Sequence, residues 1–261
     1  MRFRQRNLGQ AWGISVIGKH LIKTCAALGI TALWGQGAEA CRLALVLAMD
    51  VSSSVDGTED ALQRRGLASA LLAPQVQAAF FASPDPVALA VLEWSGRYNQ
   101  MILQDWILIE SPAILANVST RIADTPRSHD DYPTALGYAL VYAGTLLNNA
   151  PNCTFQTIDV SGDGLNNEGF GPREAYGAFP FADVTVNGLV INVPETAASR
   201  EEPEELLDYY RSEVIRGPAA FVEVANGFED FARAMEAKLV RELGALVVGH
   251  NELLLGMGQG G

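Results

Sequence analysis

Residues 43–56, LALVLAMDVSSSVD, decide the fold of this chain. The apolar run 43–49 leads directly into Asp50, and three serines follow within the next four positions. An unbroken apolar run that ends in small polar residues is typical of a strand buried on both faces. Open α/β sheets bind their ligands outside the carboxyl ends of such strands. The stretch therefore predicts a central strand with a polar site at its C-terminal end.

A second apolar run, residues 155–160, ends in the same way, with Ser161-Gly162-Asp163-Gly164. Further strands are predicted at 86–95, 184–193 and 219–224, with an edge strand at 100–109. Helices are predicted at 57–81 with a break at Pro74, and at 111–124, 134–149, 173–181, 202–215 and 228–243. Strands that alternate with helices predict one doubly wound α/β domain, a mostly parallel sheet with helices on both faces. We expect the Asp50 and Asp163 strands to lie side by side at its centre.

The first forty residues differ from the rest. They carry five basic residues and no acid before Glu39, then an apolar block at 24–34 and the small-x-small sequence Ala38-Glu39-Ala40. The block is too short to span a bilayer. We interpret residues 1–40 as a secretory signal peptide, with an uncleaved N-terminal anchor as the alternative. The expected location is therefore periplasmic or secreted.

Export changes the expectation for the cysteines. Cys25 lies in the predicted leader, which leaves Cys41 and Cys153 as a pair in an oxidising compartment. Cys41 precedes Asp50 by nine residues, and Cys153 precedes Asp163 by ten. If the two strands are parallel neighbours, both cysteines lie at the same end and nearly in register. We predict a disulfide between them; two unpaired buried thiols are the alternative.

The composition limits the partners. Apolar residues make up 49% of the 261 residues, enough for a full core, and the formal net charge is −12. Removal of the leader, with five positive charges and one negative, makes the charge −16. This acidity argues against nucleic acid or an anionic membrane as the main partner. No membrane span is expected in the mature chain, and the tail 244–261, which ends in GMGQGG, is expected to be loosely held.

Five oxygen-bearing side chains form a candidate metal site: Asp50, Ser52, Ser54, Thr134 and Asp163. Carboxylates with hydroxyls make a hard, all-oxygen site of the kind that Mg²⁺ prefers. The pattern D-x-S-x-S, then a distant Thr, then a distant Asp-Gly resembles the metal-ion-dependent adhesion site of von Willebrand factor type A domains. The resemblance covers about residues 43–243. In more detail, LVLAMDVSSSVD, TALGYAL, IDVSGDGLNNEG and VNGLVI are similar to an exported bacterial family of type A-like proteins without an assigned function.

The resemblance implies a role for each residue. Ser52, Ser54 and Thr134 would contact Mg²⁺, or else Mn²⁺ or Ca²⁺, through their hydroxyls. Asp50 and Asp163 would bind through water or directly. Such a site leaves a position open for a carboxylate of a protein partner. The expected function is an exported adhesion or scaffold module without catalysis, engaging an acidic residue of its partner.

Two other functions stay open. One is a structural exported domain whose site is empty. The other is a Mg²⁺-dependent phosphohydrolase with Asp50 as nucleophile, but the haloacid dehalogenase-like scheme needs a second aspartate where Ser52 stands, because proton transfer needs a titratable group. The run His129-Asp130-Asp131 is either a metal site or a solvated loop. Asn166 and Asn167 either line the rim of the site or form a turn.

Overall fold

The fold comes from a computed structural model, which describes residues 41–193 and 203–257. The predicted signal peptide, residues 1–40, lies outside these ranges. The described residues form a six-stranded sheet in the order β3-β2-β1-β4-β5-β6. The strands are β1 (Cys41–Asp50), β2 (Val87–Trp94), β3 (Gln100–Ile109), β4 (Cys153–Gly162), β5 (Val184–Ile191) and β6 (Val222–Ala225).

Neighbouring strands run parallel except for β3, which pairs antiparallel with β2 through a hairpin. The prediction of a doubly wound, mostly parallel sheet with an edge hairpin is confirmed. The chain passes from β1 outward to β2 and β3, and from β4 outward in the other direction to β5 and β6. The order therefore reverses between β1 and β4, so Asp50 and Asp163 follow neighbouring strands at the switch point.

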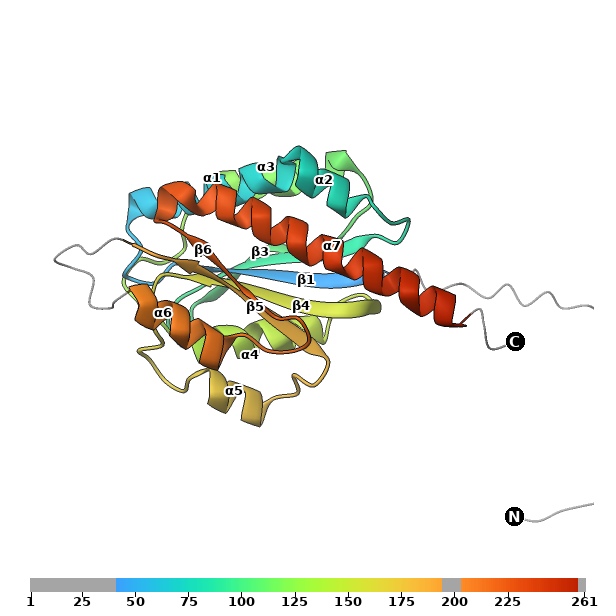
Figure 1. The fold of residues 1–261 in the computed structure, drawn as a ribbon. Coiled ribbons are helices and arrows are strands. Elements are labelled where there is room, and N and C mark those ends of the chain that lie inside the picture. The colour runs from blue at the N-terminus through green and yellow to red at the C-terminus, as the bar shows by residue number, and fades with distance from the viewer. Residues whose placement is uncertain (1–40, 194–202, 258–261) are drawn as a thin grey trace, which may run out of the picture. The chain divides into compact units, whose positions relative to one another are not determined.

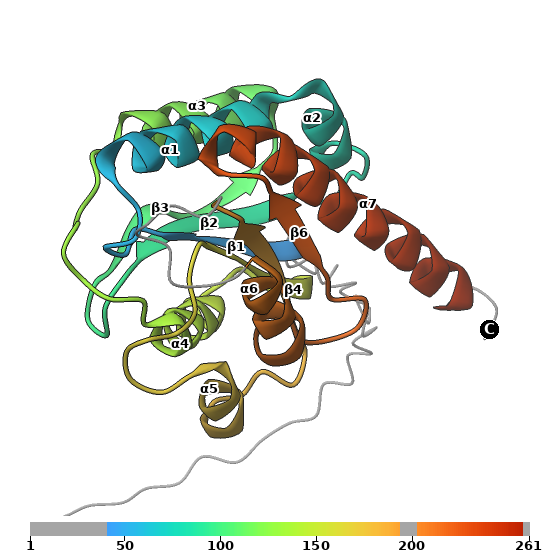
Figure 2. The ribbon, with the colours of Figure 1, turned by 60° about the vertical axis from the view of Figure 1, so that its left-hand side comes forward.

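Helices cover both faces of the sheet (Figures 1 and 2). On one face lie α1 (Gly57–Leu72), α2 (Pro74–Phe80), α3 (Pro112–Asp124) and α7 (Phe231–Met257). On the other lie α4 (Leu136–Leu147), α5 (Pro172–Ala178) and α6 (Pro203–Tyr209). All ten residues of β1 are buried. Successive side chains of a strand point to opposite faces, so Leu43, Leu45 and Leu47 join the α1–α7 core while Ala44 and Val46 join the α4–α6 core.

Several boundaries differ from the sequence prediction. The 202–215 helix continues past α6 as a π-helix, Tyr210–Val214, in which the Ile215 N–H donates to the Tyr210 carbonyl at 3.0 Å. The last strand is β6 rather than 219–224, and Ala219 has a positive φ of 58°. The last helix begins after a short 3₁₀ turn, Phe228–Asp230, and runs to Met257 instead of ending at residue 243. A single glycine costs a helix only about 1 kcal/mol, so Gly244 does not end it.

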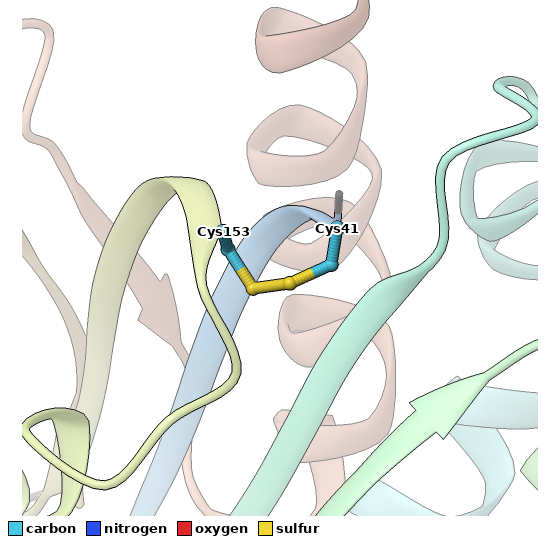
Figure 3. Close-up of a disulfide and its surroundings, with 2 residues drawn as sticks. All are labelled: Cys41 and Cys153. Carbon is cyan, nitrogen blue, oxygen red and sulfur yellow. A yellow bond between two sulfur atoms is a disulfide. The ribbon is translucent and has the colours of Figure 1, made fainter. Parts of the chain in front are cut away.

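The predicted disulfide joins Cys41 and Cys153, whose Cα atoms lie 4.4 Å apart (Figure 3). The two residues are register partners at the amino ends of β1 and β4. The disulfide thus ties the two central strands together at the end opposite to Asp50. Within the described parts of the chain, no helix has the length and apolar character needed to cross a membrane.

Candidate metal site

The loop after β1 carries three of the predicted residues. Asp50 ends the strand fully buried, and its Oδ1 accepts from the backbone N–H of Ser52 at 2.8 Å. The Ser52 side chain is buried, and Ser54 two residues on is exposed. Helix α1 starts immediately after the loop because Asp56 caps it and accepts from the N–H groups of its first turn. The end of β1 and the cap of α1 therefore fix both ends of this short loop.

Thr134 comes from the loop before α4. The structure begins this helix at Leu136, two residues later than predicted, and leaves the Thr134 side chain buried. Its Oγ1 donates to Ser52 Oγ at 3.2 Å. Two residues earlier along the same loop, the carbonyl of Tyr132 accepts from the Ser53 N–H at 2.8 Å. The Thr134 loop therefore lies directly against the D-x-S-x-S loop.

Asp163 completes the group at the end of β4. Its Oδ1 accepts from Ser54 Oγ at 2.7 Å, and Ser54 Oγ lies 3.1 Å from Ser52 Oγ. Hydrogen bonds therefore join Asp163, Ser54, Ser52 and Thr134 in one chain, and the same loop binds Asp50. All five predicted side chains converge on the carboxyl edge of the sheet, although 113 positions separate the first from the last.

The oxygen spacing fits an octahedral ion. With bonds of about 2.0–2.1 Å to Mg²⁺, adjacent ligand oxygens lie about 2.9 Å apart. Neighbouring side-chain oxygens of the site are 2.7, 3.1 and 3.2 Å apart. Hydroxyls dominate the site. Consistent with this, the described residues contain no cluster of three or more His, Cys, Asp or Glu that could hold a metal ion.

The electrostatics of the site also favour a cation. Burial raises the pKa of Asp50 well above its ordinary value, and the negative charge of Asp163 raises it further. Hydrogen bonds from Ser52 and the charge of Arg127 offset only part of this effect. One carboxylate oxygen, Asp50 Oδ2, is buried without a hydrogen-bond partner among the described residues. Two neighbouring carboxylates, one fully buried and one half-buried, favour a positive charge between them, which a divalent ion supplies.

Three supporting residues were not identified as such from the sequence. The Asn167 Oδ1 accepts from the Thr134 N–H at 2.9 Å, and the Asn166 Oδ1 accepts from the Gly137 N–H at 3.2 Å. Both amides thus accept from backbone N–H groups at the start of α4, whose N-cap residue makes no side-chain cap bond, and Asn167 lies beside Thr134 of the site. A guanidinium nitrogen of Arg127 donates to the carbonyls of Val51 and Ser52 at 2.8 and 2.9 Å. The only signal in the sequence for such supporting roles was the preference of Asn for helix N-caps.

Exposed tyrosines flank the site. Tyr98 is 86% exposed on the turn between β2 and β3, and Tyr132 is 41% exposed. The turn is anchored by an ion pair between Arg97 and Glu168, 3.2 Å apart. His129 packs edge-on against the Tyr132 ring, with centroids 5.1 Å apart, and its neighbours Asp130 and Asp131 are exposed. The solvated-loop interpretation of this run agrees with the structure.

Comparisons with solved structures show the fold. Proximal thread matrix protein 1 from the mussel byssus is 15% identical, with a TM-score of 0.56; the match covers 78% of this chain and 48% of that one. A further structure of that protein has a zinc-occupied MIDAS motif, the metal-ion-dependent adhesion site, with a TM-score of 0.52, 16% identity and the same coverage. The von Willebrand factor type A protein from Catenulispora acidiphila is 17% identical, with a TM-score of 0.53, covering 78% and 43%.

The pilus adhesin SpaC from Lactobacillus rhamnosus GG is 13% identical, with a TM-score of 0.55, covering 80% of this chain and 31% of the adhesin. This chain thus spans less than half the length of these structures. No curated protein matches it. A family model described as "Protein of unknown function (DUF1194)" matches residues 40–247. The chain therefore belongs to the DUF1194 family, and its fold is that of a von Willebrand factor type A domain.

Proposed function

We propose that this chain is an exported, metal-dependent protein-binding module. Asp50, Ser52, Ser54, Thr134 and Asp163 hold a divalent cation, Mg²⁺ by preference. The observation that carries the proposal is the direct hydrogen bonding of three loops through these side chains at one point on the sheet edge. The zinc-occupied MIDAS motif of the mussel matrix protein, on the same fold, supports it.

The residues of the site have distinct tasks. The three hydroxyls are neutral ligands, so the two carboxylates supply all of the negative charge. A cation held this way keeps an open position that binds a carboxylate from the partner. The buried Asp50 orders the loop through the Ser52 N–H, while the exposed Ser54 lies where a partner can approach.

The surface around the site suits a protein partner. Tyr98 and Tyr132 offer large rings on anchored loops, and tyrosine is enriched where proteins bind one another. The disulfide supports a periplasmic or secreted location, because such bonds persist in oxidising compartments. The adhesin among the structural neighbours is in keeping with this assignment.

The test is the melting temperature of the protein with and without metal. Mg²⁺ or Mn²⁺ at a hundred times its dissociation constant should stabilise the fold by about 2.7 kcal/mol. Asp50→Ala should abolish the rise in melting temperature. Asp124→Ala, which removes an exposed carboxylate at the end of α3, should keep it. A wild-type protein that no divalent ion stabilises would favour the structural domain instead.

A photo-crosslinking residue at position 98 tests the partner. Adducts formed in cells should disappear with a chelator and with Asp50→Ala, and a crosslinker at the exposed Leu72, at the far end of α1, should not form them.

A phosphate ester assay tests the alternative function, a Mg²⁺-dependent phosphohydrolase. Asp50 is fully buried, which obstructs attack by its carboxylate. Mg²⁺-dependent turnover that Asp50→Ala abolishes would overturn the proposal.

A further inference from the structure

Tyr210 is a fully buried tyrosine whose ring lies in a slot made by two glycines of the sheet. A Cβ on Gly188 of β5 would lie 2.6 Å from the Tyr210 Cδ1 atom. A Cβ on Gly162, at the end of β4, would lie 2.6 Å from the Tyr210 hydroxyl. Either contact is too close for a real side chain, so the ring fits only because both residues lack one. The glycines point the hydroxyl toward the end of β4, next to Asp163.

The π-helix places Tyr210 in this slot. The wider turn is closed by the bond from the Ile215 N–H to the Tyr210 carbonyl, and the Tyr176 hydroxyl donates to the Val214 carbonyl at the other end. π-helical turns are rare and occur frequently at functional sites. The local distortion and the two glycines together indicate that the position of this hydroxyl matters.

The hydroxyl faces an acceptor of the metal site. The position of a Cβ on Gly162 lies 2.6 Å from the Tyr210 hydroxyl and 2.9 Å from Asp50 Oδ2, so the two oxygens flank the same point. Both are buried, and neither has a hydrogen-bond partner among the described residues. A phenol keeps its proton at neutral pH and is a donor, and a carboxylate oxygen is an acceptor. The two unpaired groups are therefore complementary.

We propose that Tyr210 is a positioning residue of the metal site: its hydroxyl is hydrogen-bonded to Asp50 Oδ2 through one bridging water. The other oxygen of the same carboxylate accepts from the Ser52 N–H. Bonds to both oxygens fix the rotation of the carboxylate and hold the D-x-S-x-S loop in the form that binds metal. This inference rests on the proposed function, because it assigns a support to the same site. Removing a hydrogen-bond partner of a metal ligand typically weakens metal binding 10–100-fold.

The first test is the Mn²⁺ affinity of Tyr210→Phe, measured by calorimetry on the mature chain. The variant keeps the ring in its slot and loses only the hydroxyl. We expect Mn²⁺ to bind about tenfold more weakly than to the wild type. Tyr142→Phe is the matched control, because it removes the hydroxyl of a half-buried tyrosine on α4 that takes no part in the slot or the π-helix, and it should bind as the wild type does. Equal affinities for Tyr210→Phe and wild type overturn the inference.

The second test needs no metal. In the wild-type background Tyr210→Phe should lower the melting temperature, because a water-bridged hydrogen bond to a carboxylate is lost. In an Asp50→Ala background it should leave the melting temperature unchanged or raise it, because the hydroxyl then has no acceptor. Equal shifts in both backgrounds would refute the contact. If the wild type binds no Mn²⁺, the proposed function and the role of Tyr210 are both overturned. If the wild type and Tyr210→Phe bind Mn²⁺ with equal affinity, only the role of Tyr210 is overturned.

Discussion

At the scale of single residues, the site is made of common side chains whose positions are fixed by neighbours. Thr134 illustrates this. Its hydroxyl contacts Ser52, but its backbone is held by Asn167, whose Oδ1 accepts from the Thr134 N–H while the Asn167 N–H donates to the Thr134 carbonyl at 3.0 Å. Both backbone groups of Thr134, its N–H and its carbonyl, are thus bonded to one residue of the loop after β4; we call this pair of bonds the Asn167 clamp. The asparagine determines where the threonine hydroxyl lies.

This clamp predicts an effect on metal affinity. Asn167→Ala should weaken Mn²⁺ binding about tenfold, since a partner that orients a ligand is removed. Asn167→Asp should retain the binding, because a carboxylate oxygen accepts the same bond. Calorimetric titration with Mn²⁺ measures both. Asn149→Ala, at an exposed position after α4, is the control. If Asn167→Ala binds like the wild type, the clamp has no role in the site.

At the scale of elements, α7 is attached to the centre of the sheet by buried charges. Lys238 of α7 lies 2.9 Å from Asp159 Oδ1 of β4 and 2.6 Å from Glu242 Oε1, one turn further along the helix. Asn187 of β5 donates to the same Glu242 oxygen at 2.7 Å. All of these side chains are buried. One ammonium therefore faces two carboxylates in a region that solvates charge poorly.

The consequence is a pH-dependent stability. Burial raises the pKa of Asp159 from 3.8 to about 7 in the folded chain, with Glu242 adding to the rise and Lys238 opposing it. The ion pair at 2.9 Å lowers this pKa but does not outweigh the loss of hydration. The folded state then binds the proton more tightly than the unfolded state does.

The stabilising contribution of Asp159 is accordingly complete below about pH 4 and is lost as the pH rises through about 7. Urea unfolding between pH 4.5 and 8 should show a free energy of unfolding that decreases with pH through this group. Asp159→Asn should flatten that part of the profile, and Asp105→Asn, at an exposed position of β3, should not. A profile that is unchanged in Asp159→Asn would contradict the assignment.

At the scale of the whole molecule, β1 and β4 connect two ends with different tasks. Their amino ends carry the disulfide, and their carboxyl ends carry Asp50 and Asp163. Along β1 the nine residues from Cys41 to Asp50 span about 30 Å at 3.3 Å per residue. The covalent link is therefore remote from the candidate metal site. Stability and ion binding should be separable in this fold.

Removing the disulfide should lower the free energy of unfolding by up to about 5 kcal/mol, because the bond closes a long loop in the unfolded chain. The separation of the two cysteines is 112 residues. The Mn²⁺ affinity should stay unchanged. Urea unfolding and calorimetry of Cys41→Ser/Cys153→Ser, each at a temperature where the variant is folded, measure the two quantities. A loss of affinity in the folded variant would show that the two ends are coupled.

The main features of the fold could be predicted because they depend on local patterns. The apolar runs that become β1 and β4 read as buried strands, and parallel strands place their carboxyl ends at one edge. That reasoning brought together Asp50, the two serines and Asp163. It also placed the cysteines in register. The π-helix, the extension of α7 and the partners of Asn167 and Tyr210 have no such pattern, because they arise between segments far apart in sequence.

By itself, then, the sequence determined which side chains stand at strand ends and which strands form the centre, since burial on two faces requires unbroken apolar runs. Only the tertiary structure decided how those side chains are held. Hydrogen bonds across loops, the slot at Gly162 and Gly188, and the buried charges beneath α7 depend on atoms meeting in space. Such contacts leave no periodicity along the chain, because each joins one residue to one distant partner.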